Sequence, residues 1–152
     1  MIMTQEEKDL LLKDLCARLP YGVVVGTIDN DGSLSNFWTL DLYNRLTEDV
    51  IITHCELNAD ELTYFGDIRP YLFPLERMTE EQCHEFYCRF VENEINYDDF
   101  KEYYFDNGLW HKVLTSIDDC SEVIDWFNKN HFDYRNLIDK KLAIDCTNLN
   151  IY

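Results

Sequence analysis

Positive charge is scarce in this chain of 152 residues, where 13 Lys and Arg stand against 30 Asp and Glu and the net charge is −17. The acidic excess is largest in residues 51–100, where 12 acids accompany 3 bases. Nucleic-acid binding depends on Lys and Arg that neutralise phosphates, and anionic lipid surfaces attract basic segments. We therefore expect no nucleic-acid partner and no membrane partner. The charge itself has two interpretations, a solubilising surface or an acidic face that meets a basic protein.

Proline, glycine and long hydrophobic runs are scarce as well. With 3 Pro and 5 Gly the chain has no low-complexity linker, and its length suits a single domain, residues 1–152. No stretch reaches the roughly 18 apolar residues of a membrane span. The first residues, MIMTQEEKDLLLKDL, are acidic where an export signal is basic. The six cysteines are irregularly spaced, which is typical of reduced thiols, so the sequence predicts a cytoplasmic protein.

What the chain does contain is 46% hydrophobic residues, and three segments carry them at helical spacing. The first two segments begin with capping boxes, in which Thr4 pairs with Glu7 and Thr79 pairs with Gln82. The expected helices cover residues 4–19, residues 79–92, and a segment that begins at Ser116 or Asp118 and buries apolar residues at 123–127.

Between the first two helices the sequence is rich in β-branched and aromatic residues. The turn sequence Asp29–Gly32 predicts a hairpin. Residues 96–115 are ambiguous, with a short helix at 97–104 and a strand at 109–114. The expected strands cover 23–28, 34–43, 50–53, 62–65 with Ile68 (ending at Pro70 and Pro74), and 142–144 after a short helix at 134–139. The predicted class is α+β: an N-terminal helix, a small antiparallel sheet arranged as a meander or half-barrel, and C-terminal helices packed on it.

Three segments of the chain resemble a known family. They are LLLKDLCARLPYGV at 10–23, IRPYLFPLERMTEEQ at 68–82 and HFDYRNLIDKKLAID at 131–145. Together they resemble a family of small acidic proteins, of no known activity, encoded by gut Bacteroidales and their phages and mobile elements. The resemblance implies a cytoplasmic protein with an accessory or host–phage role, and it implies no cofactor or catalytic residue.

The residues that carry chemistry form no recognisable catalytic or metal-binding pattern. His54 and His84 each adjoin a cysteine, but adjacent residues face different directions and no CxxC or HxxxH pair is present. His111 or His131 could meet a cysteine only through the fold. The acids of two clusters lack the context that separates the pKa values of a catalytic pair. These clusters are Glu92, Glu94, Asp98, Asp99 and Glu102, and Asp118 with Asp119. We expect no catalytic, cofactor or metal residues.

The best-supported function is a non-enzymatic module that binds a basic protein. Acids and abundant aromatics together are typical of such an interface. The helix at 79–92 places Glu80, Glu81, Glu85 and Glu92 opposite its apolar stripe, so these four are the predicted partner-binding residues. Charge reversal there is expected to change stability little. A phage or mobile-element antagonist that mimics nucleic acid is a special case. The alternatives are a small enzyme with a carboxylate or Cys–His site and a structural or assembly component.

Overall fold

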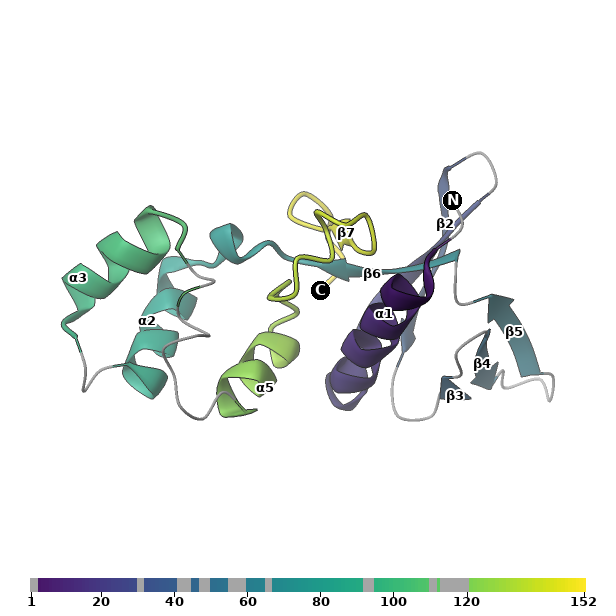
Figure 1. The fold of residues 1–152 in the computed structure, drawn as a ribbon, viewed down its shortest axis with the longest axis horizontal. Coiled ribbons are helices and arrows are strands. Elements are labelled where there is room, and N and C mark those ends of the chain that lie inside the picture. Colours follow the sequence, from purple (N-terminus) through teal and green to yellow (C-terminus); the bar gives the residue numbers. More distant parts are fainter. Residues whose placement is uncertain are drawn as a thin grey trace. The chain divides into compact units, whose positions relative to one another are not determined.

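The computed structural model describes residues 3–29, 32–40, 45–46, 50–54, 60–64, 67–91, 95–109, 112 and 121–152. The chain divides into two compact units, which we call unit 1 (Met1–Leu72 with Arg135–Tyr152) and unit 2 (Phe73–Tyr134). An N-terminal helix, strands and then further helices follow one another along the chain (Figure 1), which confirms the predicted α+β class. That the two units fold together as a single domain, as the chain length suggests, stays a prediction.

The first helix of unit 1, α1, covers Gln5–Arg18 and confirms the helix predicted over 4–19. Its N-cap is Thr4, whose side chain accepts a hydrogen bond from the Glu7 N–H while the Glu7 carboxylate accepts one from the Thr4 N–H. The two bonds satisfy backbone donors that the first turn leaves open. A short 3₁₀ turn at Leu19–Tyr21 ends the helix, and Gly22, at φ 68°, turns the chain into the first strand.

The four-stranded sheet of unit 1 is built from β1 (Val23–Ile28), β2 (Leu34–Leu40), β6 (Ile68–Leu72) and β7 (Ile144–Asp145). Its strand order is β2-β1-β6-β7. The predicted hairpin of β1 and β2 is confirmed, with Val25 opposite Trp38. The predicted meander is wrong, because β1 pairs with β6 on its other side and β7 joins β6 in parallel. The sheet is therefore mixed.

Pro70 lies inside β6, opposite Val25 of β1, so the prediction that a strand ends at this residue is wrong. Proline lacks an N–H and fits only where no neighbouring strand needs that donor. β7 meets this requirement because it pairs with β6 only at Tyr71 and Leu72, beyond the proline.

A second, antiparallel sheet contains β3 (Arg45–Leu46), β4 (Val50–His54) and β5 (Asp60–Tyr64). β4 confirms the strand predicted at 50–53, and β5 begins two residues before the strand predicted at 62–65 and overlaps it. As a meander predicts, these two consecutive strands pair with each other, from Val50 opposite Tyr64 to His54 opposite Asp60. They do so in a sheet separate from the first, which the prediction did not include.

The core of unit 1 is aliphatic, and α1 contributes Leu11 and Leu15 to a cluster with residues of β1, β2 and β6. A fully buried ion pair lies on the same helix, where Arg18 Nε is 2.7 Å from Asp14 Oδ2. Arg135 Nε is 3.2 Å from the other Asp14 oxygen. Because a buried charge is costly unless it is paired, these contacts fix Asp14 against the segment that contains Arg135.

Unit 2 is helical. It contains a 3₁₀ turn at Leu75–Arg77, α2 (Glu80–Phe90), α3 (Tyr97–Phe100), a π-helix at Lys101–Asp106 that continues α3, and α5 (Ser121–Lys129). α2 confirms the helix predicted at 79–92 together with its capping box, since Thr79 and Gln82 cap each other reciprocally. α5 buries Val123, Trp126 and Phe127 as predicted, whereas Ile124, also expected to be buried, is half-buried. The predicted start at Ser116 or Asp118 lies outside the described residues.

The ambiguous and C-terminal segments differ from the predictions. A helix does begin at Tyr97, but the strand predicted at 109–114 lies mostly outside the described residues, and Lys112 within it is helical. Turns occupy 134–139 in place of the predicted short helix, because Asn136 adopts φ 56°, which a right-handed helix does not allow. The strand predicted near 142–144 is β7.

Candidate functional site

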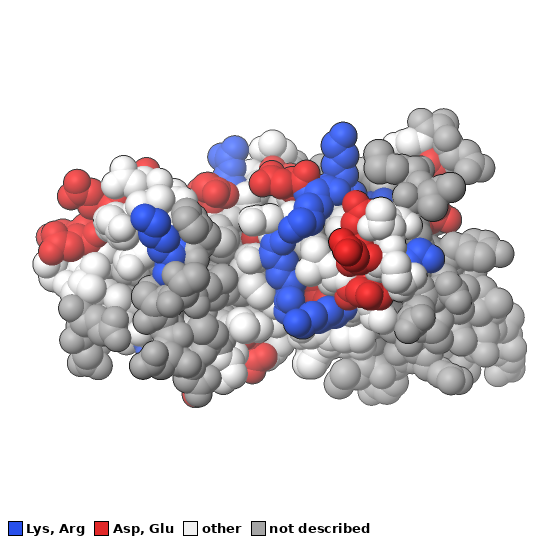
Figure 2. All heavy atoms as spheres, in the orientation of Figure 1, with Lys and Arg blue, Asp and Glu red and all other residues white. Residues whose placement is uncertain are grey.

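Unit 2 carries the greater share of the acidic excess. Residues 73–134 contain 15 Asp and Glu and 5 Lys and Arg, a difference of −10, whereas the rest of the chain contains 15 and 8, a difference of −7. Asp98, Asp99 and Glu102 are exposed on α3 and the π-helix, and acidic side chains gather over α3 in Figure 2. Acidic side chains line two surface hollows of unit 2, so unit 2 contains the candidate binding site.

The structure gives the four predicted partner-binding residues unequal roles. Glu80 accepts a 2.6 Å hydrogen bond from the Lys101 ammonium, which lowers the pKa of the Glu80 carboxyl and raises the pKa of Lys101. Glu85 accepts a 3.1 Å hydrogen bond from the indole N–H of Trp126. Glu81 is exposed and has no partner among the described residues. Glu92 lies outside the described residues. Glu81 is therefore the one of the described three that can offer a whole carboxylate to another molecule.

The expectation that charge reversal on this face changes stability little stays a prediction, and the contact of Glu85 with Trp126 argues against it for that residue. The carboxylate of Glu85 accepts a hydrogen bond that links α2 to α5. The donor is the indole N–H of Trp126, a residue that is 3% exposed. A lysine there would remove the acceptor and leave the N–H of Trp126 unpaired, which is costly for a buried donor. The contact joins residues 41 positions apart, so no local pattern in the sequence could indicate it.

One hollow lies beside α2 and is lined by Glu80, Glu81, His84 and Tyr97, with a volume of about 380 Å³. The rings of His84 and Tyr97 meet edge to face, 4.9 Å between centroids. Cys83 of the same helix is buried, and burial raises the pKa of its thiol to about 11. The hollow thus combines two carboxylates, an imidazole and an aromatic ring.

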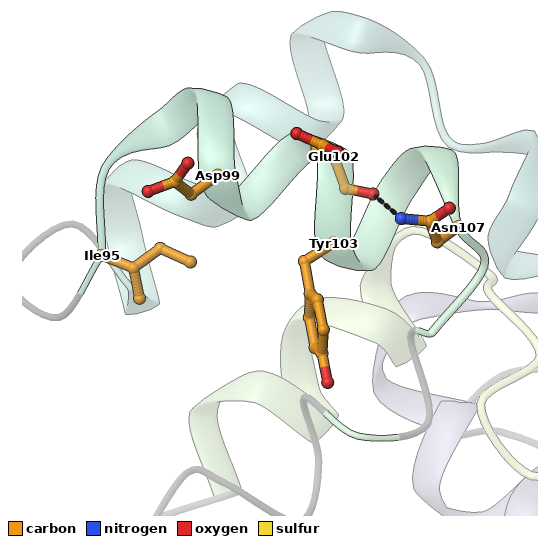
Figure 3. A pocket seen from close by; sticks show the side chains of 5 residues that line it. All are labelled: Ile95, Asp99, Glu102, Tyr103 and Asn107. Atoms are coloured by element: carbon orange, nitrogen blue, oxygen red, sulfur yellow. Dashed lines mark hydrogen bonds between the residues drawn. The ribbon is translucent and has the colours of Figure 1, made fainter.

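A second hollow, of about 350 Å³, lies along α3 and the π-helix and is lined by Ile95, Asp99, Glu102, Tyr103 and Asn107. In Figure 3 the Tyr103 ring projects from the helix, with Glu102 above it, Ile95 and Asp99 to one side and Asn107 to the other. The Asn107 side chain donates a 2.7 Å hydrogen bond to the Glu102 carbonyl and closes the wide turn. π-Helical turns are rare and are often found at functional sites.

Tyr103 already holds a cation. The ammonium of Lys112 is 5.7 Å from the centre of its ring and 3.4 Å from its hydroxyl oxygen, and Tyr103 is 45% exposed. The two distances place the ammonium at the phenol end of the ring, where the hydroxyl oxygen accepts its hydrogen bond. The ring therefore offers a lysine-type side chain a contact, and Asp99 and Glu102 line the same hollow.

The structure also brings together a cysteine and a histidine that the sequence reasoning did not pair. Cys88 Sγ is 3.7 Å from Nδ1 and 3.9 Å from Nε2 of His84, one turn earlier on α2. The spacing of four between His84 and Cys88 was readable from the sequence and puts them on one helix face. His111, Asp118 and Asp119 lie outside the described residues.

Within the described ranges no group of three or more His, Cys, Asp or Glu side chains is arranged to hold a metal ion. In the same part of the chain no helix is both long enough and apolar enough to cross a membrane.

Comparison with protein-family models, with curated proteins and with solved structures gives no match to this chain. The resemblance to Bacteroidales and phage proteins stays a prediction.

Proposed function

We propose that this protein is a non-enzymatic binding module and that the hollow of Tyr103 takes a basic segment of a protein partner. The observation that carries the proposal is the contact of the Lys112 ammonium with Tyr103, a residue whose hollow is also lined by Asp99 and Glu102. A lysine or arginine of a partner could make the same contact with Tyr103.

Charge and composition support the same proposal. The net negative charge of unit 2, −10 from its acidic and basic side chains, attracts a basic partner over about a Debye length, roughly 8–10 Å at physiological salt. Such attraction acts mainly on the association rate. Tyr103 supplies the exposed aromatic surface from which interfaces draw much of their binding energy. Glu81, in the other hollow, supplies a further carboxylate that is not engaged within the described chain.

The biological setting of the proposal comes from the sequence resemblance. An accessory or antagonist protein of a phage or mobile element would use the acidic surface against a basic host or phage protein. If that partner itself binds nucleic acid, the carboxylates of unit 2 would occupy its basic groove, and duplex DNA would compete for it. Competition by DNA therefore separates mimicry from ordinary binding to a basic segment.

The test uses the full chain and a fluorescent lysine-rich peptide, with a glutamate-rich peptide of equal length as the control ligand. Anisotropy titrations over a salt series should show that the lysine-rich peptide binds and weakens as salt rises. Glu102→Gln should weaken binding because it removes a carboxylate from the hollow. Tyr103→Ala should weaken binding by about 0.5–2 kcal/mol because it removes the ring that contacts the cation. The matched control is Asp98→Asn, which removes one charge from the neighbouring exposed residue outside the hollow.

Equal losses for Glu102→Gln and Asp98→Asn would show that only total charge matters. No salt-dependent binding of the lysine-rich peptide would contradict the proposal.

A further inference from the structure

His84 and Cys88 form a thiol–imidazole pair on the exposed side of α2. Both residues are exposed, and the sulfur is within 4 Å of both ring nitrogens. Whichever tautomer the ring adopts, one nitrogen can accept the thiol proton. The resulting thiolate, paired with imidazolium, is the nucleophilic form of cysteine.

The other three described thiols lack this arrangement. Cys83 and Cys146 are fully buried, and burial raises the pKa of Cys83 to about 11 and of Cys146 to about 12. Cys16 is exposed on α1, but partial desolvation raises the pKa of its thiol. Among the described histidines, none lies at hydrogen-bond distance from any of these three. Among the described thiols, access and a proton acceptor coincide at Cys88.

The charge around the pair selects the reagent. Glu81, His84, Glu85 and Cys88 follow one another at helical spacing on one face of α2. The hollow that His84 lines also contains Glu80 and Glu81 and has room for a small ammonium group. These carboxylates oppose formation of the thiolate, and the imidazolium offsets them. Because Lys101 already neutralises Glu80, Glu81 is the carboxylate of the hollow that repels an anionic reagent and attracts a cationic one.

We propose that Cys88 is a site of thiol–disulfide exchange with small disulfides that carry amino groups, and that His84 takes the thiol proton. This modification site is independent of the binding function proposed above.

The exchange balances without any further reactant. The Cys88 proton passes to His84, and the thiolate attacks one sulfur of the disulfide. A new S–S bond joins Cys88 to half of the reagent, and the original S–S bond breaks. The departing aminothiolate takes the proton back from the imidazolium. The protein thiol is oxidised to a mixed disulfide, and the other half of the reagent is reduced to a thiol.

The experiment treats the folded full chain with cystamine near neutral pH, quenches it by alkylation at successive times, and reads each cysteine by peptide mass spectrometry. Cys88 should be modified faster than Cys16, and Cys83 and Cys146 should stay unmodified while the chain is folded. His84→Gln should lower the rate of modification at Cys88 by about threefold to fivefold, the size of effect expected of an exposed ion pair. The rate at Cys16 in the same molecules should not change, which controls for any general effect of the substitution.

Reagent charge gives the second arm. The rate of reaction at Cys88 is measured with cystamine and with a dicarboxylate aryl disulfide, and the first rate is divided by the second. The result is then divided by the same ratio for a free cysteine peptide, which gives a normalised ratio. That normalised ratio should exceed one and should fall in Glu81→Gln. The proposal is overturned if Cys88 reacts no faster than Cys16, if His84→Gln leaves its rate unchanged, or if the normalised ratio is one.

Discussion

The cores of the two units of this protein consist of different kinds of side chain. In unit 1 the buried cluster consists of Leu, Val, Ile, Met and Ala packed between α1 and the sheet. In unit 2 it is mainly aromatic, and the ring of Phe86 lies 5.0–6.2 Å from those of Phe90, Phe100, Trp126 and Phe127. Branched aliphatic side chains suit a pleated surface. Large rings fill the space between short helices that offer few other contacts.

The units also differ in how they treat charge. Unit 1 buries the carboxylate of Asp14 between Arg18 and Arg135. Unit 2 buries Asp133 but leaves its other described carboxylates exposed, and of those on α2 Glu80 and Glu85 are engaged and Glu81 is not. Unit 1 thus uses charge to fix its own packing. Unit 2 presents charge outward, which is why the proposed binding and the proposed modification both fall on it.

The largest expected effect comes from opening each core in turn. Phe86→Ala should destabilise unit 2 by about 3–5 kcal/mol, and Leu15→Ala should destabilise unit 1 by about 2–5 kcal/mol, because each leaves a cavity. Segment-resolved amide hydrogen exchange should show the loss of protection in Phe86→Ala concentrated in α2 and α5, and that in Leu15→Ala concentrated in α1 and β1. Equal losses in both units from either substitution would break the comparison and favour one cooperative domain.

A smaller effect separates two neighbouring acids of α2. Glu85→Lys should lower the free energy of unfolding by about 1 kcal/mol, because the Trp126 N–H loses its acceptor. Glu81→Lys makes the same charge change and should cost no more than about 0.5 kcal/mol. Denaturant midpoints measure both, and Glu85→Gln, which keeps an oxygen acceptor, should lie near the parent. A Glu81→Lys loss as large as that of Glu85→Lys would indicate that local charge, not the indole contact, sets the cost.

The smallest effect is a difference in pH dependence between the two capping boxes. Hydrogen bonds from Thr4 lower the pKa of Glu7, whose ordinary value is 4.5. The stabilisation of this box is therefore present above about pH 4.5 and is lost as the pH falls through the lower folded-state pKa. The box of α2 uses Gln82, which does not titrate.

In a proton NMR titration the amide shift of Thr4 should move with a midpoint below 4.5, while that of Thr79 should not follow it. Glu7→Gln is the control and should make the first box as insensitive to acid as the second. A Thr79 amide that titrates together with Thr4 would show that the acid effect is global.

Local features of the fold could be predicted from the sequence, and contacts between distant residues could not. Both capping boxes are spelled out within four residues, and the hairpin of β1 and β2 follows from its turn. The parallel pairing of Tyr71 with Ile144 has no such signature, since it joins positions 73 residues apart. Pro70 misled the prediction because a proline's tolerance in a strand depends on which neighbours the strand acquires.

The candidate site divides in the same way. The acidic and aromatic character of residues 73–134 was visible in composition, and so was the exposed face of α2. That Glu80 is matched by Lys101, that Glu85 is held by Trp126 and that Tyr103 holds Lys112 depends on tertiary geometry. The His84–Cys88 pair differs, because its spacing could have been read directly.

The return of residues 135–152 to pair beside β6 has a consequence for how the protein is made. β6 is synthesised well before β7, and all of unit 2 lies between them in the chain. At roughly 5–20 residues per second, translation of residues 73–152 takes about 4–16 s. During that time unit 1 lacks Arg135, a partner of the buried Asp14, and β6 has one unpaired edge. Unit 2 has its whole sequence available earlier. On the ribosome the aromatic unit can therefore close first, and the aliphatic unit, although it begins the chain, is completed last.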